Sequence, residues 1–241
     1  MAAAVFNSTA IGLGFSINLY IQTFFWEFRS DQIALFTFAS LTAALLAFAS
    51  AARVSQRFGK KPSAMGLIFV SMLLTCLPIV LRLMGAFPEN GSPALFPLVF
   101  GLSIISVGLG ITGNILLTSM IADVVEDSEL RTGRRSEGLF FAANAFVAKA
   151  VTGIGIFVSS ILLTGIGFPD GARPGEVAPE VVRNLGLVVA PTLAILYGTA
   201  VAILIGYRIT RASHLESLRR LAAAADLAAE GEPPGSTSRL S

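Results

Sequence analysis

The sequence predicts an all-α integral membrane protein with six transmembrane helices. Of its 241 residues, 54% are hydrophobic and only 13% are charged, which is about half the charged share of an average soluble domain. A soluble fold of this size cannot bury so much apolar sequence. The apolar residues also gather into long uninterrupted runs, and about 20 such residues are needed for a helix to cross a bilayer. These observations place the chain in a membrane.

Six apolar runs define the predicted helices. In chain order they are residues 4–26, 32–53, 63–85, 95–120, 139–165 and 186–208. Backbone groups inside a lipid bilayer must be satisfied within the protein, and runs of this length exclude β-barrel strands, which need only about ten residues. We therefore expect one six-helix bundle over residues 1–209. Residues 210–241 form a predicted cytoplasmic tail, which begins as an amphipathic helix and ends in a disordered stretch rich in Gly, Pro and Ser.

The distribution of positive charge predicts the orientation of the bundle. Most of the 17 Lys and Arg residues lie in the second connection, the fourth connection and the tail. Positive residues are retained on the cytoplasmic side of a membrane, so both termini are predicted to be cytoplasmic. Trp26 then falls at the outer end of the first run, where we assign it to the aromatic belt of the membrane interface.

The composition also excludes several function classes. The chain has one cysteine and one histidine, Cys76 and His214, too few for a disulfide framework or a Cys- or His-based metal site. It contains neither a His-Glu-x-x-His motif nor a phosphate-binding glycine loop with lysine. We therefore expect no enzyme activity, no metal centre and no nucleic-acid partner.

The second connection is a short basic turn. Its characteristic residues are Arg57, Gly59, Lys60 and Lys61. Glycine permits a tight turn, and the basic side chains anchor it at the cytoplasmic face. The pattern resembles the basic loop that major facilitator transporters place between the second and third helices of each six-helix half.

The fourth connection carries a dense charged motif. Its candidate residues are Asp123, Asp127, Glu129, Arg131, Arg134, Arg135 and Glu137. Over residues 119–150 the sequence resembles the glycoside–pentoside–hexuronide:cation symporters, the melibiose-permease-like branch of the major facilitator superfamily. The resemblance implies a cytoplasmic gate whose ion pairs hold one transporter conformation. The alternative is a solvated turn, where exposed ion pairs contribute roughly 0–1 kcal/mol each.

The same resemblance implies a fold and a function for the whole chain. The six runs correspond to helices seven to twelve of such a transporter, that is, to one half built as a 3 + 3 inverted repeat. Implied partners are membrane lipids, an N-terminal six-helix half from the same gene or a separate chain, and a small polar solute such as a sugar or glycoside. The implied location is a bacterial-type plasma (inner) membrane.

The implied activity is cation-coupled symport by alternating access. No organic cofactor is expected. A coupling Na⁺ or H⁺ is expected to be bound mainly by the N-terminal half, because no acidic residue lies deep in any of the six runs. The alternatives are a non-transporting fragment, a scaffold that binds other helices, or a major facilitator carrier of a non-sugar solute.

Lys149 and Asn144 are candidate substrate-binding or coupling residues in the fifth run. Lys149 lies ten residues after Leu139, or about 15 Å along a helix, close to the middle of the bilayer. Charged side chains at that depth usually face a cavity or a partner. The resemblance implies that this lysine and the nearby Asn144 lie near the solute and cation sites. The alternative for Lys149 is a structural lysine that pairs with a carbonyl or extends to the interface.

Two stripes of polar and small residues with the same spacing supply the remaining candidate site residues. The first run contains Asn7, Gly14, Asn18 and Gln22, and the fourth contains Ser103, Gly110, Asn114 and Thr118. Each stripe lies on one helix face. Because the first and fourth helices correspond in an inverted repeat, both stripes are predicted to face the transport path, with Asn18, Gln22 and Asn114 binding solute or coupling ion. The alternative is that the stripes are helix–helix contacts.

Overall fold

The computed structural model describes residues 2–132 and 137–206. At positions 2, 121, 124–132, 137, 139–141, 143–144 and 147–148 it describes the backbone alone. Within these residues the chain is helical throughout apart from short connections, and no strand occurs. The all-α prediction is therefore confirmed. The predictions for the tail lie outside the described residues.

The helices follow the predicted runs closely. They are α1 (Ala2–Tyr20), a π-helix η1 (Ile21–Phe25), α2 (Ser30–Phe58), α3 (Lys60–Leu83), α4 (Leu95–Thr132), α5 (Glu137–Gly165) and α6 (Pro179–Gly206). Among the described residues, α1 continued by η1, α2, α3, α4 and α6 are each long and apolar enough to cross a membrane. The described residues of α5 supply a shorter apolar stretch, Lys149–Gly165.

The turn predicted in the second connection is a single residue long. Gly59 separates α2 from α3 with φ +82°, a backbone conformation that favours glycine. Its N–H donates to the carbonyl of Ser55 at 2.9 Å, which closes the last turn of α2. Arg57 therefore lies within α2, and Lys60 and Lys61 begin α3.

Two helix ends differ from the predicted connections. The fourth connection was expected to be a turn from residue 121 onward, but α4 continues as a helix to Thr132. The apolar run ends where the helix would leave the membrane. The Glu and Arg residues that follow are good helix formers in water, so the helix continues beyond the apolar run. Similarly, α6 begins at Pro179, with Glu180 in its first turn, both typical of a helix start.

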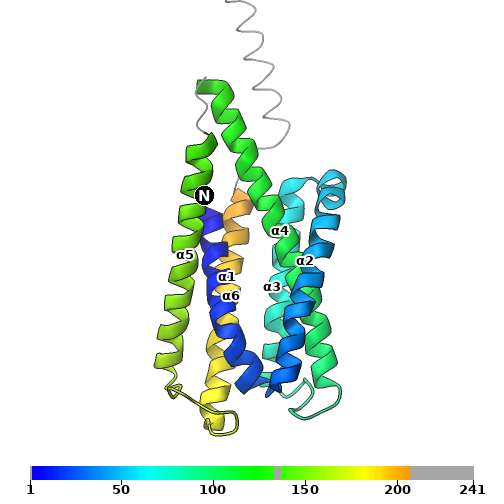
Figure 1. Ribbon diagram of the computed structural model, residues 1–241, viewed down its shortest axis with the longest axis vertical. Coiled ribbons are helices and arrows are strands. Elements are labelled where there is room, and N and C mark those ends of the chain that lie inside the picture. The colour runs from blue at the N-terminus through cyan, green and yellow to red at the C-terminus, as the bar shows by residue number, and fades with distance from the viewer. Residues whose placement is uncertain (1, 133–136, 207–241) are drawn as a thin grey trace, which may run out of the picture. The chain divides into compact units, whose positions relative to one another are not determined.

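The helices form two packed groups. Figure 1 shows α1 beside α5 and α6, and α4 beside α2 and α3. The groups pack together mainly through α3 and α6. Exchanging α1 with α4, α2 with α5 and α3 with α6 leaves this pattern of neighbours unchanged, as a 3 + 3 repeat requires.

Small residues set the spacing within each group. A Cβ added at Gly155 of α5 would lie 2.6 Å from the backbone N of Leu13 in α1. In the other group, α2 buries an alanine at every fourth position from 39 to 51, and Gly108 of α4 faces one of them, Ala43. Such residues let helix backbones approach closely in a membrane.

Candidate functional site

The π-helix η1 positions the end of the polar stripe on α1. The Trp26 N–H donates to the carbonyl of Ile21 at 2.9 Å, and the Phe28 N–H donates to that of Gln22 at 2.9 Å. The first of these bonds spans five residues rather than four, which widens the turn. Single π turns inside α-helices occur frequently at functional sites.

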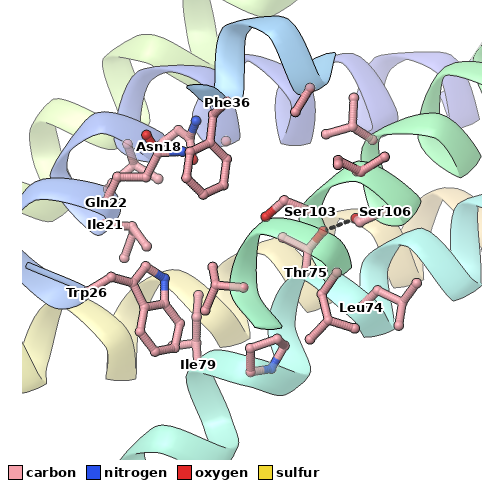
Figure 2. A pocket seen from close by; sticks show the side chains of 18 of the residues that line it. Asn18, Ile21, Gln22, Trp26, Phe36, Leu74, Thr75, Ile79, Ser103 and Ser106 are labelled. Carbon is pink, nitrogen blue, oxygen red and sulfur yellow. Dashed lines mark hydrogen bonds between the residues drawn. The ribbon is translucent and has the colours of Figure 1, made fainter. Parts of the chain in front are cut away.

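A cavity of about 170 Å³ lies between the two helix groups. Its wall is mostly apolar and includes Ile21, Trp26, Phe36 and Ile79. Its polar lining residues are Asn18, Gln22, Ser40, Thr75, Ser103 and Ser106. Figure 2 shows Asn18 and Gln22 across an opening from Ser103, Thr75 and Ser106. None of the residues that line this cavity has an ionisable side chain.

The structure brings parts of the two predicted stripes to the same cavity. Gly14, Asn18 and Gln22 line it from α1 and η1, and Ser103 lines it from α4. Asn18 is exposed in this chain. The binding roles assigned to Asn18 and Gln22 stay predictions, but the two residues share a wall.

Gln22 is the most informative of these residues. It is only 6% exposed, and its side chain makes no hydrogen bond to the described residues. Among the described residues, the side-chain polar atoms that are both inaccessible and without a hydrogen-bond partner are Asn7 Oδ1 and Asn90 Oδ1. The amide atoms of Gln22 are not in this group, so they remain accessible. The unpaired amide of Gln22 is therefore open to the cavity, where it can bind a polar group.

The opposite wall carries a hydroxyl network that the sequence did not reveal. Thr75 Oγ1 and Ser106 Oγ lie 2.6 Å apart, Ser106 Oγ donates to the carbonyl of Ser71 at 3.0 Å, and Ser71 Oγ donates to the carbonyl of Ser106 at 2.9 Å. These bonds hold the hydroxyls in place before any ligand binds. The four-residue spacing of Ser71 and Thr75 was a visible signal, since it places both on one face of α3.

The structure also changes the assignment of Trp26, which the sequence placed in the aromatic belt of the membrane interface. It is 4% exposed and lines the cavity, so it is not a residue of an exposed aromatic belt. Its ring packs against Phe25, at 4.9 Å between ring centroids, and against Phe87, at 5.6 Å. The sequence placed Trp26 at the end of an apolar run, but only the packing shows which way its ring faces.

Asn114 does not line the cavity. Its Oδ1 accepts a hydrogen bond of 2.9 Å from Asn7 Nδ2 on α1. Asn7 is 1% exposed. This pair corresponds to the alternative considered for the stripes, a helix–helix contact, at the Asn7 end of α1.

Lys149 lies on an exposed face of α5 and does not line the cavity. It is about 160° around the helix from Val151, which is buried against the bundle at 7% exposure. The side chain of Asn144 lies outside the described residues. The structure therefore does not bring Lys149 to the cavity, and the role predicted for Asn144 stays a prediction.

The two predicted cytoplasmic motifs meet at one point. Lys60 Nζ lies 2.6 Å from Asp123 Oδ1, and the two side chains are 38% and 50% exposed. Lys61 Nζ donates to the carbonyl of Ile205 in α6 at 3.3 Å, and Arg57 lies over the ring of Phe58. The remaining gate side chains, Asp127, Glu129, Arg131, Arg134, Arg135 and Glu137, lie outside the described residues.

A second hollow, of about 430 Å³, lies between α1, α5 and the connection from α5 to α6. Its wall contains Tyr20, Phe24 and Phe168, whose rings pack against one another with centroids 4.9–6.1 Å apart. None of its lining residues belongs to the predicted stripes. The cavity beside Gln22 is therefore the better candidate site.

Comparison with known proteins gives a family and two relatives. A family described as "MFS/sugar transport protein" matches residues 1–211. The chain is 34% identical over 136 residues to an uncharacterized symporter of Synechocystis sp., covering 54% of this chain and 25% of the relative. It is 31% identical over 156 residues to the sphingosine-1-phosphate transporter MFSD2B of Mus musculus, covering 61% and 28%. The chain thus matches about a quarter of the length of these relatives. No solved structure matches it.

Proposed function

The chain belongs to the family of MFS/sugar transport proteins, and on this premise we propose that it forms the C-terminal half of a secondary active transporter. Family membership identifies a membrane transporter rather than an enzyme. In the proposed mechanism an N-terminal six-helix half faces this bundle, and the two halves expose the solute path to each side of the membrane in turn.

One observation carries the proposal. Unpaired polar groups from α1 and η1 share a cavity with hydroxyls from α3 and α4. Polar groups inside a membrane protein are costly unless they face partners or a water-filled path. The volume of about 170 Å³ is below the roughly 300–1,000 Å³ of typical ligand pockets. A wall contributed by a second half would complete the site.

We further propose that the solute is a sugar or glycoside, carried together with Na⁺ or H⁺. The description of the family and the name of the Synechocystis relative support this choice. Amides, hydroxyls and the indole of Trp26 are suited to an uncharged, hydroxyl-rich ligand. The coupling ion would be bound mainly by the N-terminal half, because the cavity lining contains no carboxylate.

Lys149 and the charged end of α4 have proposed roles outside the cavity. A charged group on an exposed face of a membrane-spanning helix is expected to meet protein or water rather than lipid, so Lys149 would face the N-terminal half near the solute path. Asp123 and its neighbours would act as a cytoplasmic gate. The pairing of Asp123 with Lys60 supports a contact within this half as one part of that gate.

A second candidate solute is a lipid-like molecule. The mouse relative is named as a sphingosine-1-phosphate transporter, and most of the cavity wall is apolar. However, a phosphate group prefers a cationic partner, and none of the lining residues is cationic. A non-transporting fragment or helix-binding scaffold is the remaining alternative.

Uptake measurements in cells that make this chain, alone and with a complementary N-terminal half, test the proposal. Accumulation of a radiolabelled sugar should require both halves and should stop when ionophores collapse the Na⁺ or H⁺ gradient. Gln22→Leu should raise KM about 2- to 12-fold, the factor expected for one lost hydrogen bond. The matched control is Thr9→Val, since the Thr9 hydroxyl bonds only the carbonyl of Val5 on its own helix.

Each outcome has a defined meaning. Gradient-driven accumulation by this chain alone would contradict the half-transporter proposal. Accumulation of sphingosine phosphate but not of sugars would overturn the sugar assignment. Unchanged uptake in a Lys149→Ala variant would remove the proposed role of that lysine.

A further inference from the structure

A single hydrogen bond links α1 to α4 among the described side chains. It joins Asn7 Nδ2 to Asn114 Oδ1 at 2.9 Å. The two helices otherwise belong to different packed groups and share almost no close backbone contact within the described residues. Among the described side chains, the Asn7–Asn114 bond is therefore the hydrogen bond that joins the two groups on the α1–α4 side of the bundle.

The orientation of both amides follows from their surroundings. Asn114 Nδ2 donates to the carbonyl of Gly110 at 3.2 Å, so Asn114 must present its oxygen to Asn7. Asn7 must then present its nitrogen, which leaves its own oxygen without a donor. Among the described residues, Asn7 Oδ1 is indeed buried and has no hydrogen-bond partner. Leaving a buried acceptor unsatisfied is unfavourable, so the closed arrangement carries a built-in cost.

The bond lies beyond one end of the candidate cavity. Along α1 the cavity lining begins at Gly14, seven residues after Asn7, and along α4 it ends at Val107, seven residues before Asn114. Seven residues are about two turns, or roughly 10 Å, on each helix. Trp26 lines the cavity further along the chain, at the end away from Asn7. The two helices are thus joined on one side of the cavity and separated at the cavity itself.

We propose that the Asn7–Asn114 hydrogen bond closes the cavity on the Asn7 side, and that it breaks when the cavity opens to that side. Asn7 and Asn114 are then positioning residues for alternating access and do not bind the solute. The inference rests on the proposed transport function. When α1 and α4 separate, water reaches both amides and donates to Asn7 Oδ1. The unpaired oxygen therefore lowers the cost of opening, because it is satisfied only in the open arrangement.

Accessibility of a cysteine in the cavity tests this inference without a transport measurement. The reporter is Ser103→Cys in a Cys76→Ala background. Sealed membrane vesicles of each orientation, prepared from cells that make the protein, are treated with a small membrane-impermeant methanethiosulfonate. Asn7→Ala and Asn114→Ala should each accelerate labelling from the Asn7 side, by about 3- to 18-fold, the factor that average and strong interhelical hydrogen bonds imply.

Two comparisons separate a specific closure from general loosening. Asn114→Ala should act more strongly than Asn7→Ala, since it leaves both amide atoms of the fully buried Asn7 unpaired. The double variant should be no more accessible than the stronger single variant, because both changes remove the same bond. Thr9→Ala, two residues from Asn7 with a hydroxyl bonded only within α1, should label as the reporter protein does.

The inference would be overturned if either single variant were labelled from the Asn7 side no faster than the Thr9→Ala control. It would also be overturned if the acceleration in the double variant were the product of the accelerations in the two single variants. Faster labelling from both sides would indicate a loosened bundle and would equally refute it. The proposed function fails on a different result, namely the absence of solute uptake when the unmodified chain is made together with the N-terminal half.

Discussion

The close contact of α5 with α1 at Gly155 gives the sharpest prediction about stability. Gly155 of α5 packs directly on the backbone of α1, and Gly153 of the same helix has nothing within 4 Å of an added Cβ. Gly155→Ala and Gly153→Ala therefore add the same methyl group to the same helix, once at a tight contact and once in open space. Because alanine favours a helix over glycine by about 1 kcal/mol at both positions, that effect cancels in the comparison.

The size of the difference follows from the contact distance. The Gly155 Cβ would lie 2.6 Å from Leu13 N, whereas ordinary contacts begin at 3.4 Å, so α5 must move from α1 by about 0.8 Å along that direction. A gap of 0.5–1 Å removes a quarter to a half of the dispersion energy of the atoms involved. Overpacking of this kind costs about 1–3 kcal/mol. Gly155→Ala should be less stable than Gly153→Ala by that amount.

Unfolding in mixed micelles with increasing SDS measures this difference. Trp26 is the only tryptophan and is buried, so its fluorescence reports loss of the packed bundle. The Gly155→Ala variant should unfold at a lower SDS fraction than the Gly153→Ala variant. Equal midpoints for the two variants would refute the proposed packing of α1 on α5.

Three further predictions concern single contacts. Lys60→Met should lower the free energy of unfolding by less than about 1 kcal/mol, because its partner Asp123 is half exposed; a loss that persists at high salt would contradict a simple exposed ion pair. Cys76 should resist maleimide labelling until SDS unfolds the bundle, since the residue is only 8% exposed and its Sγ lies 3.5 Å from the Ala190 carbonyl oxygen; rapid labelling of the native protein would place it elsewhere. Ser106→Ala should raise the KM for the solute while Thr192→Val does not, because Ser106 lines the cavity whereas the Thr192 hydroxyl bonds the Val188 carbonyl within α6; equal effects of the two changes would remove the hydroxyl network from the site.

The sequence predicted some residues of the candidate site but not others, and the reason is physical. Spacing along a helix shows which residues share a face, so the α1 stripe was recognisable, and Gln22 lies at the cavity. Spacing does not show what that face meets. Asn114 belongs to an equally regular stripe, yet its amide is bonded to Asn7. The places of Thr75 and Trp26 in the cavity wall were not predicted, because hydroxyl and aromatic residues occur throughout membrane helices.

The sequence by itself determined the helices, because lipid offers no partner for backbone groups and each long apolar run must satisfy its own hydrogen bonds. It also determined the turn at Gly59, where a positive φ suits glycine. Only the tertiary structure decided which faces meet. The approach of Gly155 to Leu13 and the Asn7–Asn114 bond join residues far apart in the chain, and no local pattern predicted the π turn at Ile21–Phe25. Such contacts arise from the packing of all six helices together, which local patterns do not encode.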